Sequence, residues 1–383
     1  MSQESYRPRW LTDDVVMVQD VARRFFATEF APNLEAWREK GCIDRSVWRK
    51  AGELGLLGAS LPEEYGGGDS KALMAAVLME QGRVGDASWG ISVQNYVCHY
   101  ILTYGTDEQR ARWLPGMAAG ELIAAIAMTE PGAGSDLKEL KTTARRDGDT
   151  YVVSGQKTFI SNGQTADLIV VAAKTDPAAG AKGVSLVVVE ADMPNFRRGR
   201  PLKKIGLHAA DTSELFFDDV VVPADNLLGQ AEGQGFKQLM SQLPWERLSI
   251  AIRCVGMAEY AIAQTLDHVT SRKMFGGTLF DLQNTQFKLA EAKTKLEAMR
   301  AFVDSCLDRL VEGKLDVATA ATCKLHCSQA INEIVDECLQ LHGGYGFMEE
   351  YAIAKLYGDV RAQKIYGGAN EVMKLLIARN LVS

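Results

Sequence analysis

The residues with the clearest potential for chemistry are Glu246 and Arg247, in the run Leu-Pro-Trp-Glu-Arg-Leu at 243–248. This run follows a glycine-rich, turn-prone segment at 229–235 and opens a helical pattern that continues to about Ser271. A carboxylate on a rigid helix can be held at a fixed distance from a substrate, as a catalytic base requires. The alternative is a solvated Glu–Arg pair, which is the commoner role of such neighbours on a helix.

A second segment with such potential is the glycine-rich run from Met128 to Asp136. It follows an apolar strand pattern, so its glycines can bring backbone N–H groups close to a ligand. The hydroxyl groups of Thr129 and Ser135 can add hydrogen bonds. The run is not a dinucleotide-binding fingerprint, because the G-x-G-x-x-G spacing is missing and no helical pattern follows it. Taken alone, an ordinary β-turn is the simpler explanation.

The elements that would position these residues fall into three successive parts. Residues 1–122 have helical periodicity, residues 123–232 contain short β-branched runs separated by turn residues, and residues 233–383 are helical again. The strand spacing favours an antiparallel barrel or sandwich over a βαβ sheet. Within 283–312, apolar residues recur at steps of three and four from Leu289 to Leu310, which is typical of bundle packing. We therefore predict an α+β protein with helical, β-barrel and helical-bundle domains.

Composition and charge restrict the classes of function. The chain has 383 residues, of which 47% are hydrophobic and 24% are charged, as in globular proteins of two or three domains. Its formal net charge of −7 argues against a nucleic-acid partner, which would require a basic face. No apolar run approaches the about 18 residues of a membrane span. The polar N-terminus resembles neither a signal peptide nor a presequence, so we expect a cytoplasmic protein, with a processed organellar enzyme as the alternative.

The seven cysteines are scattered along the chain, which indicates buried thiols in a reducing compartment. Cys323 and Cys327, with His326 between them, could share one face of a helix. No second pair of ligands has a suitable spacing nearby, so we expect no metal site.

Five motifs, collinear over nearly the whole chain, resemble the signatures of the acyl-CoA dehydrogenase family. They are Thr129–Asp136 (TEPGAGSD), Gly155–Gly163 (GQKTFISNG), Arg272–Gly276 (RKMFG) with Gln283, Gln340–Gly346 (QLHGGYG) and Tyr366–Glu371 (YGGANE). Their order agrees with the α–β–α arrangement indicated by the periodicity. The resemblance implies the fold of that family, including a C-terminal four-helix bundle, and a homotetramer with one FAD per subunit.

The resemblance also assigns residues to the cofactor. Those against the flavin ring would be Met128, Thr129, Ser135, Phe159 and Ser161. Those at the pyrophosphate and adenosine would be Arg272, Phe275 and Gln283, with Gln340 and Gly344 of another subunit. Hydroxyl groups of Thr129 and Ser161 would favour negative charge at the N1/N5 edge of the ring. Arg272 suits a phosphate because its planar fork bonds two oxygens, although alone it could be a surface cation. Phe159 is a departure, since many members have Trp there, but its ring should still stack on flavin.

The position of the catalytic base separates subgroups of this family. Many members have a Glu directly after the tyrosine of the last motif, where this chain has Gly367. Members that resemble the long-chain and isovaleryl-type dehydrogenases have it on a helix just before an arginine, which corresponds to Glu246. We therefore predict Glu246 as the base. Glu371 is a rival, but its place at a helix N-terminus, one turn beyond Gly367, suggests a capping role. A third alternative is an enzyme without a proton-abstracting Glu.

The resemblance implies FAD-dependent oxidation of an acyl-CoA thioester to the trans-2-enoyl-CoA. Glu246 would abstract the α-proton, and hydride would pass from the β-carbon to flavin N5. The Gly367 N–H and a ribityl hydroxyl of FAD would polarise the thioester carbonyl. Burial should raise the pKa of Glu246 toward neutrality. Ser135, Arg247 and Gly367 would line the substrate site, with a structural role as the alternative for Arg247.

An electron-transferring flavoprotein is the electron acceptor that the family implies, within fatty-acid metabolism. Gly367 would leave room near the thioester for a long or branched acyl chain. The same scaffold could instead serve a flavin-dependent oxidase or monooxygenase, an acyl-carrier-protein-linked dehydrogenase, or a binding protein without activity. Glu246 favours the dehydrogenase over the oxygenases.

Overall fold

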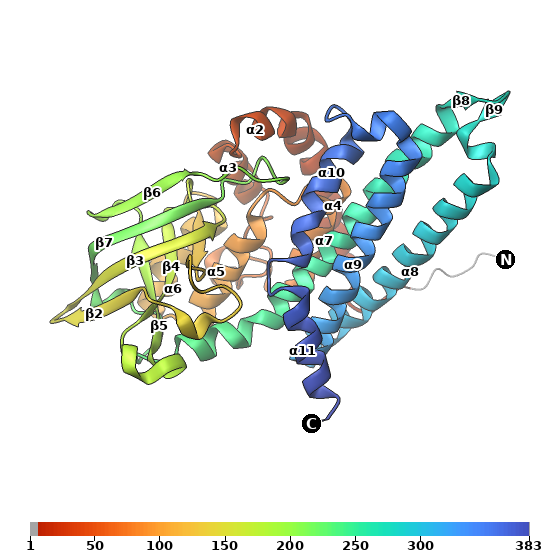
Figure 1. Cartoon of the computed structure of the whole chain (residues 1–383). Helices are drawn as coiled ribbons and strands as arrows, with labels where there is room; N and C mark the ends of the chain where they lie inside the picture. The colour runs from red at the N-terminus through yellow and green to blue at the C-terminus, as the bar shows by residue number, and fades with distance from the viewer. Residues whose placement is uncertain (1–6, 383) are drawn as a thin grey trace.

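A computed structural model describes residues 7–382 of the chain (Figure 1). Helices come first, then a seven-stranded sheet, then long helices, in the order that the sequence predicts. The predicted fold class is confirmed, whereas the domain limits at 122 and 232 stay predictions. Figure 1 shows the sheet at one end of the molecule and the C-terminal helices at the other.

The N-terminal part is built of helices around an aromatic core. Its helices are α1 (Asp13–Phe25), a π-helical turn (Phe26–Phe30), α2 (Leu34–Lys40), α3 (Arg45–Glu53), α4 (Lys71–Arg83), α5 (Ile91–Tyr104) and α6 (Asp107–Ala118). The ring of Trp89 lies 5.1–5.9 Å from the rings of Phe25, Phe26, Phe30 and Trp48. Most residues of α4 and α5 are buried, so these two helices form a rigid wall against which α7 (Gly235–Ser271) packs.

The predicted barrel takes the form of one curled sheet. Its strands are β1 (Ala124–Ala127), β2 (Thr143–Asp147), β3 (Thr150–Ile160), β4 (Leu168–Lys174), β5 (Val184–Glu190), β6 (Phe196–Pro201) and β7 (Ser213–Pro223). They are ordered β1-β4-β2-β3-β7-β6, and β5 pairs with β4. Most pairings are antiparallel as predicted, but β1–β4 and β2–β4 are parallel. The hairpin of β2 and β3 separates β1 from β4 in sequence, and this long connection lets β4 return in the direction of β1.

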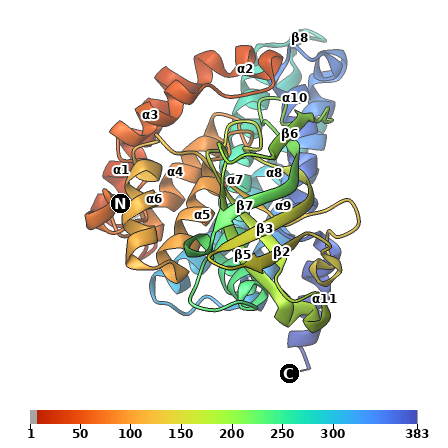
Figure 2. The ribbon, with the colours of Figure 1, turned by 90° about the vertical axis from the view of Figure 1, so that its left-hand side faces the viewer.

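The C-terminal part is a bundle of long helices. After α7 come α8 (Gln283–Val311), α9 (Val317–His342), α10 (Ala352–Arg361) and α11 (Asn370–Asn380), and a hairpin of β8 (Lys273–Met274) and β9 (Gly277–Thr278) joins α7 to α8. The apolar seam predicted in α8 is confirmed, because its residues from Leu289 to Cys306 are buried and Leu310 is half-buried. Figure 2 looks onto the sheet, with α1 to α6 on one side of it and α11 on the other. Between residues 7 and 382, no helix combines the length and the apolar character needed to cross a membrane.

A buried ion pair ties the glycine-rich run to strand β3. Lys157 is fully buried, and its Nζ donates to Glu130 Oε1 (2.8 Å), Met128 O (3.0 Å) and Ala172 O (2.7 Å). Glu130 also accepts the backbone N–H groups of Lys141 (2.7 Å) and Thr142 (3.0 Å). Burial lowers the pKa of Lys157 to about 8; it also opposes ionisation of Glu130, but Lys157 outweighs it and the pKa of Glu130 is lowered. The pair therefore closes the base of the loop at 131–140.

Lys157→Met should destabilise the protein, because it leaves the Glu130 carboxylate buried without its cation. Breaking a buried ion pair costs about 3–5 kcal/mol, so we expect a clearly lower midpoint of urea unfolding. Lys182→Met, which removes an exposed lysine from the same part of the chain, is the matched control and should leave the midpoint in place. Equal midpoints for the two variants would show that the ion pair does not stabilise the loop.

Candidate active site

Glu246 lies in α7, two residues after Pro244, with its side chain turned into the protein. Only 5% of its surface is exposed, and its Oε1 accepts a hydrogen bond of 2.9 Å from the Tyr100 hydroxyl on α5. Arg247 is only 4% exposed. Neither residue is solvated, so the surface charge pair considered from the sequence is wrong.

Three polar contacts in succession join α5 to α7, and we call them the α5–α7 polar seam. They are Ser92 with Arg253 (2.6 Å), Tyr96 with Ser249, and Tyr100 with Glu246. Spacings of four place the three α5 side chains on one face of that helix. Residue numbers rise along α5 as they fall along α7, so the helices run antiparallel. The seam fixes the rotation of α7 about its axis and hence the direction in which Glu246 points.

Burial sets the acidity of the Glu246 carboxylate. It raises the pKa of Glu246 to about 7, although the Tyr100 hydroxyl and the Arg247 cation act in the opposite direction. Such a carboxylate is a stronger base than one in water and is still substantially ionised at neutral pH. The predicted upward shift of the pKa therefore agrees with the structure.

Arg247 offers unused hydrogen-bond donors next to Glu246. Its Nε and Nη1 atoms are buried and have no hydrogen-bond partner among residues 7–382. Burial lowers the pKa of Arg247, and the Glu246 charge opposes that effect. Buried donors without acceptors are costly, so these two atoms indicate that a polar ligand completes the site.

Gly367 lies against the same face of α7 as Glu246. Its φ is +64°, and a Cβ at this position would come within 2.3 Å of Cδ1 of Ile250, one helical turn beyond Glu246. Lys324, fully buried on α9, holds this loop by donating to the Gly368 carbonyl and to Asn370 Oδ1, both at 2.8 Å. The structure thus places Gly367 against the residue one helical turn beyond Glu246.

Glu371 does not share this environment. It is exposed in the first turn of α11, where a negative charge favours a helix N-terminus. This placement supports its capping role and gives it none of the burial that would strengthen a base.

The residues predicted at the flavin ring gather where β1 and β3 end. The Thr158 N–H donates to the Thr129 carbonyl (2.9 Å), which places the first two motifs side by side. Phe159 is 67% exposed with a φ of +59° and Ser135 is exposed, whereas Met128, Thr129 and Ser161 are half-buried. A Cβ built on Gly132 or Gly134 would meet no atom within 4 Å, so this surface is open. An exposed aromatic ring beside hydroxyl groups fits a flat group with polar edges, such as a flavin.

The residues predicted at the pyrophosphate and adenosine lie at the opposite end of the molecule, around β8 and β9 (Figure 1). All five are exposed: Arg272, Phe275, Gln283, Gln340 and Gly344. The guanidinium of Arg272 lies 5.4 Å from the ring of Tyr345, beside the turn that contains Gly344 of the same chain. The residues predicted to bind one cofactor therefore form two separate groups within one chain.

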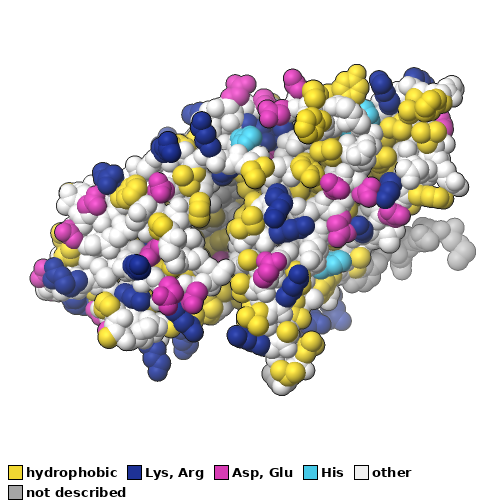
Figure 3. Space-filling view, in the orientation of Figure 1, with side chains coloured by type: hydrophobic (Ala, Val, Ile, Leu, Met, Phe, Trp, Pro, Cys, Tyr) yellow, Lys and Arg dark blue, Asp and Glu magenta, His cyan; other side chains and the backbone are white. Residues whose placement is uncertain are grey.

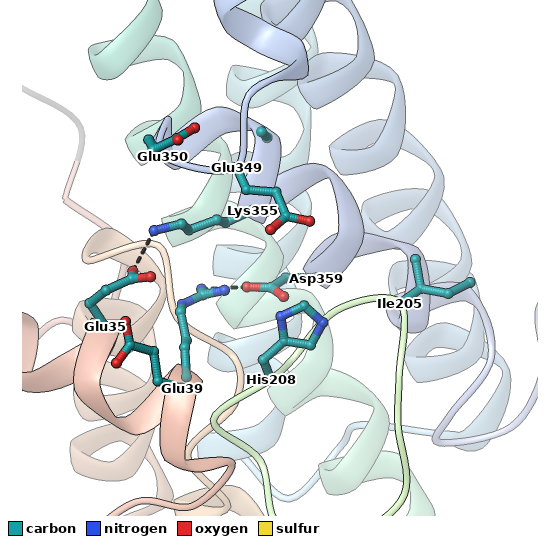
Figure 4. Close-up of a pocket in the computed structure, with 10 residues that line it drawn as sticks. Glu35, Glu39, Ile205, His208, Glu349, Glu350, Lys355 and Asp359 are labelled. Carbon is teal, nitrogen blue, oxygen red and sulfur yellow. Dashed lines mark hydrogen bonds and ion pairs between the residues drawn. The ribbon is translucent and has the colours of Figure 1, made fainter.

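A cavity of about 760 Å³ lies between α2, α10 and the loop at 205–208 (Figure 4). Its wall is charged, and Figure 4 shows Lys355 paired with Glu35. Arg38, also in the wall, forms an ion pair of 2.6 Å with Asp359. None of the predicted site residues lines it. We interpret it as a gap at the junction of the three elements.

Models of known families match three successive stretches of the chain. They are described as acyl-CoA dehydrogenase, N-terminal domain (residues 12–121), middle domain (125–220) and C-terminal domain (233–382). The chain belongs to the acyl-CoA dehydrogenase family. Its members are FAD-dependent oxidoreductases, so the predicted enzyme class and cofactor are confirmed.

Three relatives illustrate the similarity. The mitochondrial long-chain specific acyl-CoA dehydrogenase of Mus musculus is 46% identical over 369 residues, which cover 95% of this chain and 86% of the relative. The crystal structure of an acyl-CoA dehydrogenase from Geobacillus kaustophilus has a TM-score of 0.95 at 46% identity and covers 98% of this chain and 100% of its own. A Mycobacterium smegmatis glutaryl-CoA dehydrogenase in complex with FADH2 has a TM-score of 0.91 at 30% identity, covering 97% and 95%.

Sequence reasoning missed two groups that contact the predicted site. Tyr100 bonds Glu246, and Lys324 bonds the carbonyl of Gly368, next to Gly367. The spacing of Ser92, Tyr96 and Tyr100 on a largely apolar helix is a signal that could have indicated a polar face on α5. Lys324 gives no local signal, because its partners Gly368 and Asn370 lie more than 40 positions further along the chain.

Tyr100→Phe should raise the pKa of Glu246, because it removes a hydrogen bond that favours the ionised carboxylate and leaves the burial in place. A base acts only when deprotonated, so the acidic limb of the pH–rate profile, expected near pH 7, should move up by about one pH unit. The measurement is the rate of flavin reduction by acyl-CoA at a series of pH values.

Tyr104→Phe is the matched control, since the Tyr104 hydroxyl bonds the Gln238 carbonyl and Ser241 instead of Glu246. It should leave the limb where it is. A limb that stays in place or moves to lower pH in Tyr100→Phe would show that this hydrogen bond does not set the acidity of the base.

Proposed function

We propose that this protein oxidises the α,β-bond of an acyl-CoA thioester to the trans-2-enoyl-CoA, with Glu246 as the base. The observation that supports this most strongly is the carboxylate itself. It is buried, and its pKa is raised to about 7. It also lies on the same face of α7 as Ile250, the residue that packs against Gly367. Glu371, the rival carboxylate, is exposed.

In this proposal, the Glu246 carboxylate takes the proton from the carbon next to the thioester. That proton is acidic enough only when the thioester carbonyl is polarised, and the Gly367 N–H is the donor that we assign to this oxygen. The hydrogen bond from Lys324 to the Gly368 carbonyl holds the donor loop in place before substrate arrives. Bound FAD supplies the acceptor for the hydride that leaves the β-carbon. Arg247 and Ser135 would contact the thioester end of the substrate.

We assign the cofactor to two groups of residues that come from different copies of the chain. The ring group is Met128, Thr129, Ser135, Phe159 and Ser161, and the phosphate and adenosine group is Arg272, Phe275, Gln283, Gln340 and Gly344. Their separation within one chain supports an assembly, for which we propose a homotetramer. Figure 3 shows apolar side chains gathered around β8 and β9, and Phe275 and Phe347 there are 88% and 82% exposed. Exposed apolar surface of this kind is typical of an interface between subunits.

The electron acceptor that we propose is an electron-transferring flavoprotein, and the setting is fatty-acid metabolism. Family membership and the similarity to the mouse long-chain enzyme support both assignments. All seven cysteines are free, and six of them are buried, as expected in a reducing compartment such as the cytoplasm.

Glu246→Gln should lower the rate of flavin reduction at least about 100-fold, because the amide cannot accept the α-proton. The measurement is anaerobic bleaching of the enzyme-bound flavin by a panel of acyl-CoAs of different length and branching. FAD content and the unfolding temperature should match those of the unchanged enzyme. Glu371→Gln is the matched control and should retain activity. Normal bleaching by Glu246→Gln would rule out the assignment of the base.

Transfer of the glutamate from position 246 to position 367 should require a third substitution. Glu246→Thr with Gly367→Glu should be nearly inactive, because a side chain at 367 meets Ile250 at 2.3 Å on a backbone with positive φ. Adding Ile250→Ala removes that contact and should restore part of the flavin reduction. Ile250→Ala with Glu246 intact controls for loss of the isoleucine. A triple variant that is folded, loaded with FAD and inactive would show that the two base positions are not equivalent.

A further inference from the structure

Arg253 is a buried cation on the helix that carries the proposed base. Only 3% of its surface is exposed, and its Nη1 donates to the Ser92 hydroxyl at 2.6 Å. Its Nε is buried and has no hydrogen-bond partner in the part of the chain that the structure describes. Over the same residues, 7–382, no carboxylate forms an ion pair with it. The function proposed above gives this charge no role.

The position of Arg253 relates it to the substrate site. Glu246, Ile250 and Arg253 are spaced by four and three residues, so they lie along one face of α7. Seven residues of helix advance about 10 Å. Ile250, between the other two, is the residue that lies against Gly367. An acyl chain that starts at Glu246 would have to pass Ile250 and Gly367 along this face to reach Arg253.

This end of the face is closed. Every residue of α7 from Trp245 to Ala258 is buried, so water does not surround the Arg253 guanidinium. The groups that act on it electrostatically are the hydroxyls of Tyr366 and Tyr96, the thiol of Cys254 and the carboxylate of Asp86. Asp86 is already engaged, because its oxygens accept from Gln81, from Ser88 N and from Trp89 N.

The Arg253 guanidinium stays charged in this environment. Burial disfavours the charged form, but the pKa of Arg253 is raised, and a guanidinium is charged at neutral pH. A buried charge without a counter-ion costs several kcal/mol, and an arginine fork binds a carboxylate through two parallel hydrogen bonds. A carboxylate brought in by a ligand would complete the site.

We propose that Arg253, with Ser92 beside it, binds a carboxylate at the far end of the acyl chain, so that the preferred substrate is a dicarboxylic acyl-CoA. This inference rests on the proposed dehydrogenation at Glu246 and adds the substrate class to it. The closed end of the face limits the length of the chain, because the carboxylate has to reach Arg253 while the α-carbon lies at Glu246.

The test compares pairs of acyl-CoAs of equal length, one ending in a methyl group and one in a carboxylate, over a series of lengths. The holoenzyme should show a higher kcat/KM for the carboxylate member at one length. Arg253→Leu should lower the ratio of kcat/KM for that substrate to kcat/KM for its methyl partner about tenfold or more, because an effect of the lost Ser92 contact on Glu246 acts on both substrates alike. Arg300→Leu removes another arginine whose Nε lacks a partner among residues 7–382, but on α8, and should leave the ratio unchanged.

The proposal is overturned if the enzyme prefers the methyl member at every length and the ratio of the two kcat/KM values is the same in Arg253→Leu. A stronger preference for a chain that ends in a hydroxyl group also overturns it. If Arg253→Leu does not fold, Arg253→Lys and Ser92→Ala carry the test, because each weakens the contact without removing the charge. A reduced preference for the carboxylate in both variants supports the proposal, and an unchanged preference overturns it.

Failure of the proposed function would look different. In that case no acyl-CoA of either kind bleaches the flavin of the unchanged enzyme. Calorimetric binding of the same pairs to the holoenzyme and to Arg253→Leu then decides the present inference alone. Tighter binding of the carboxylate member that is lost in the variant supports the site, and equal binding of both members overturns it.

Discussion

Burial of the Glu246 carboxylate between α5 and α7 is the constraint that the rest of the site has to satisfy. Water stabilises an ionised carboxylate so well that it is a poor base, and removing the water raises the free energy of the charged form. Among residues 7–382, the structure provides one strong donor, the Tyr100 hydroxyl, and surrounds the carboxylate with packed helices. Additional hydrogen-bond donors would lower the pKa of Glu246 toward that of a carboxyl group in water. Without the Tyr100 donor, the pKa would rise and the group would be protonated at neutral pH.

The same helix also buries two arginines that lack full hydrogen bonding. Arg247 and Arg253 are each at most 4% exposed, and both have guanidinium atoms without partners within residues 7–382. Elsewhere in that range, buried charges such as Lys157 and Asp359 have direct ionic partners. The unpartnered guanidinium atoms of these two arginines lie on the helix that carries the proposed base, where a polar ligand would satisfy them.

The parts of the fold that follow from local periodicity could be predicted from the sequence. The α8 seam and the order of the three parts depend on the spacing of neighbouring residues, and both are found in the structure. The parallel pairing of β4 with β1 could not be predicted, because it depends on the path of a long connection. Motifs pointed to Glu246, but α7 is buried on all sides around it, so periodicity could not show which neighbour its side chain meets. That neighbour, Tyr100, lies 146 positions away.

The contact between Ile250 and Gly367 limits the order in which substitutions can move the glutamate from position 246 to position 367. A glutamate gained at 367 collides with the isoleucine, and a glutamate lost first at 246 removes the proposed base. A viable route therefore begins with a smaller residue at 250, a change that by itself alters no catalytic group. Descendants that keep the isoleucine are confined to the inherited arrangement. In this chain, the Cδ1 methyl group of one isoleucine thus opposes any side chain at 367 for as long as Ile250 is kept.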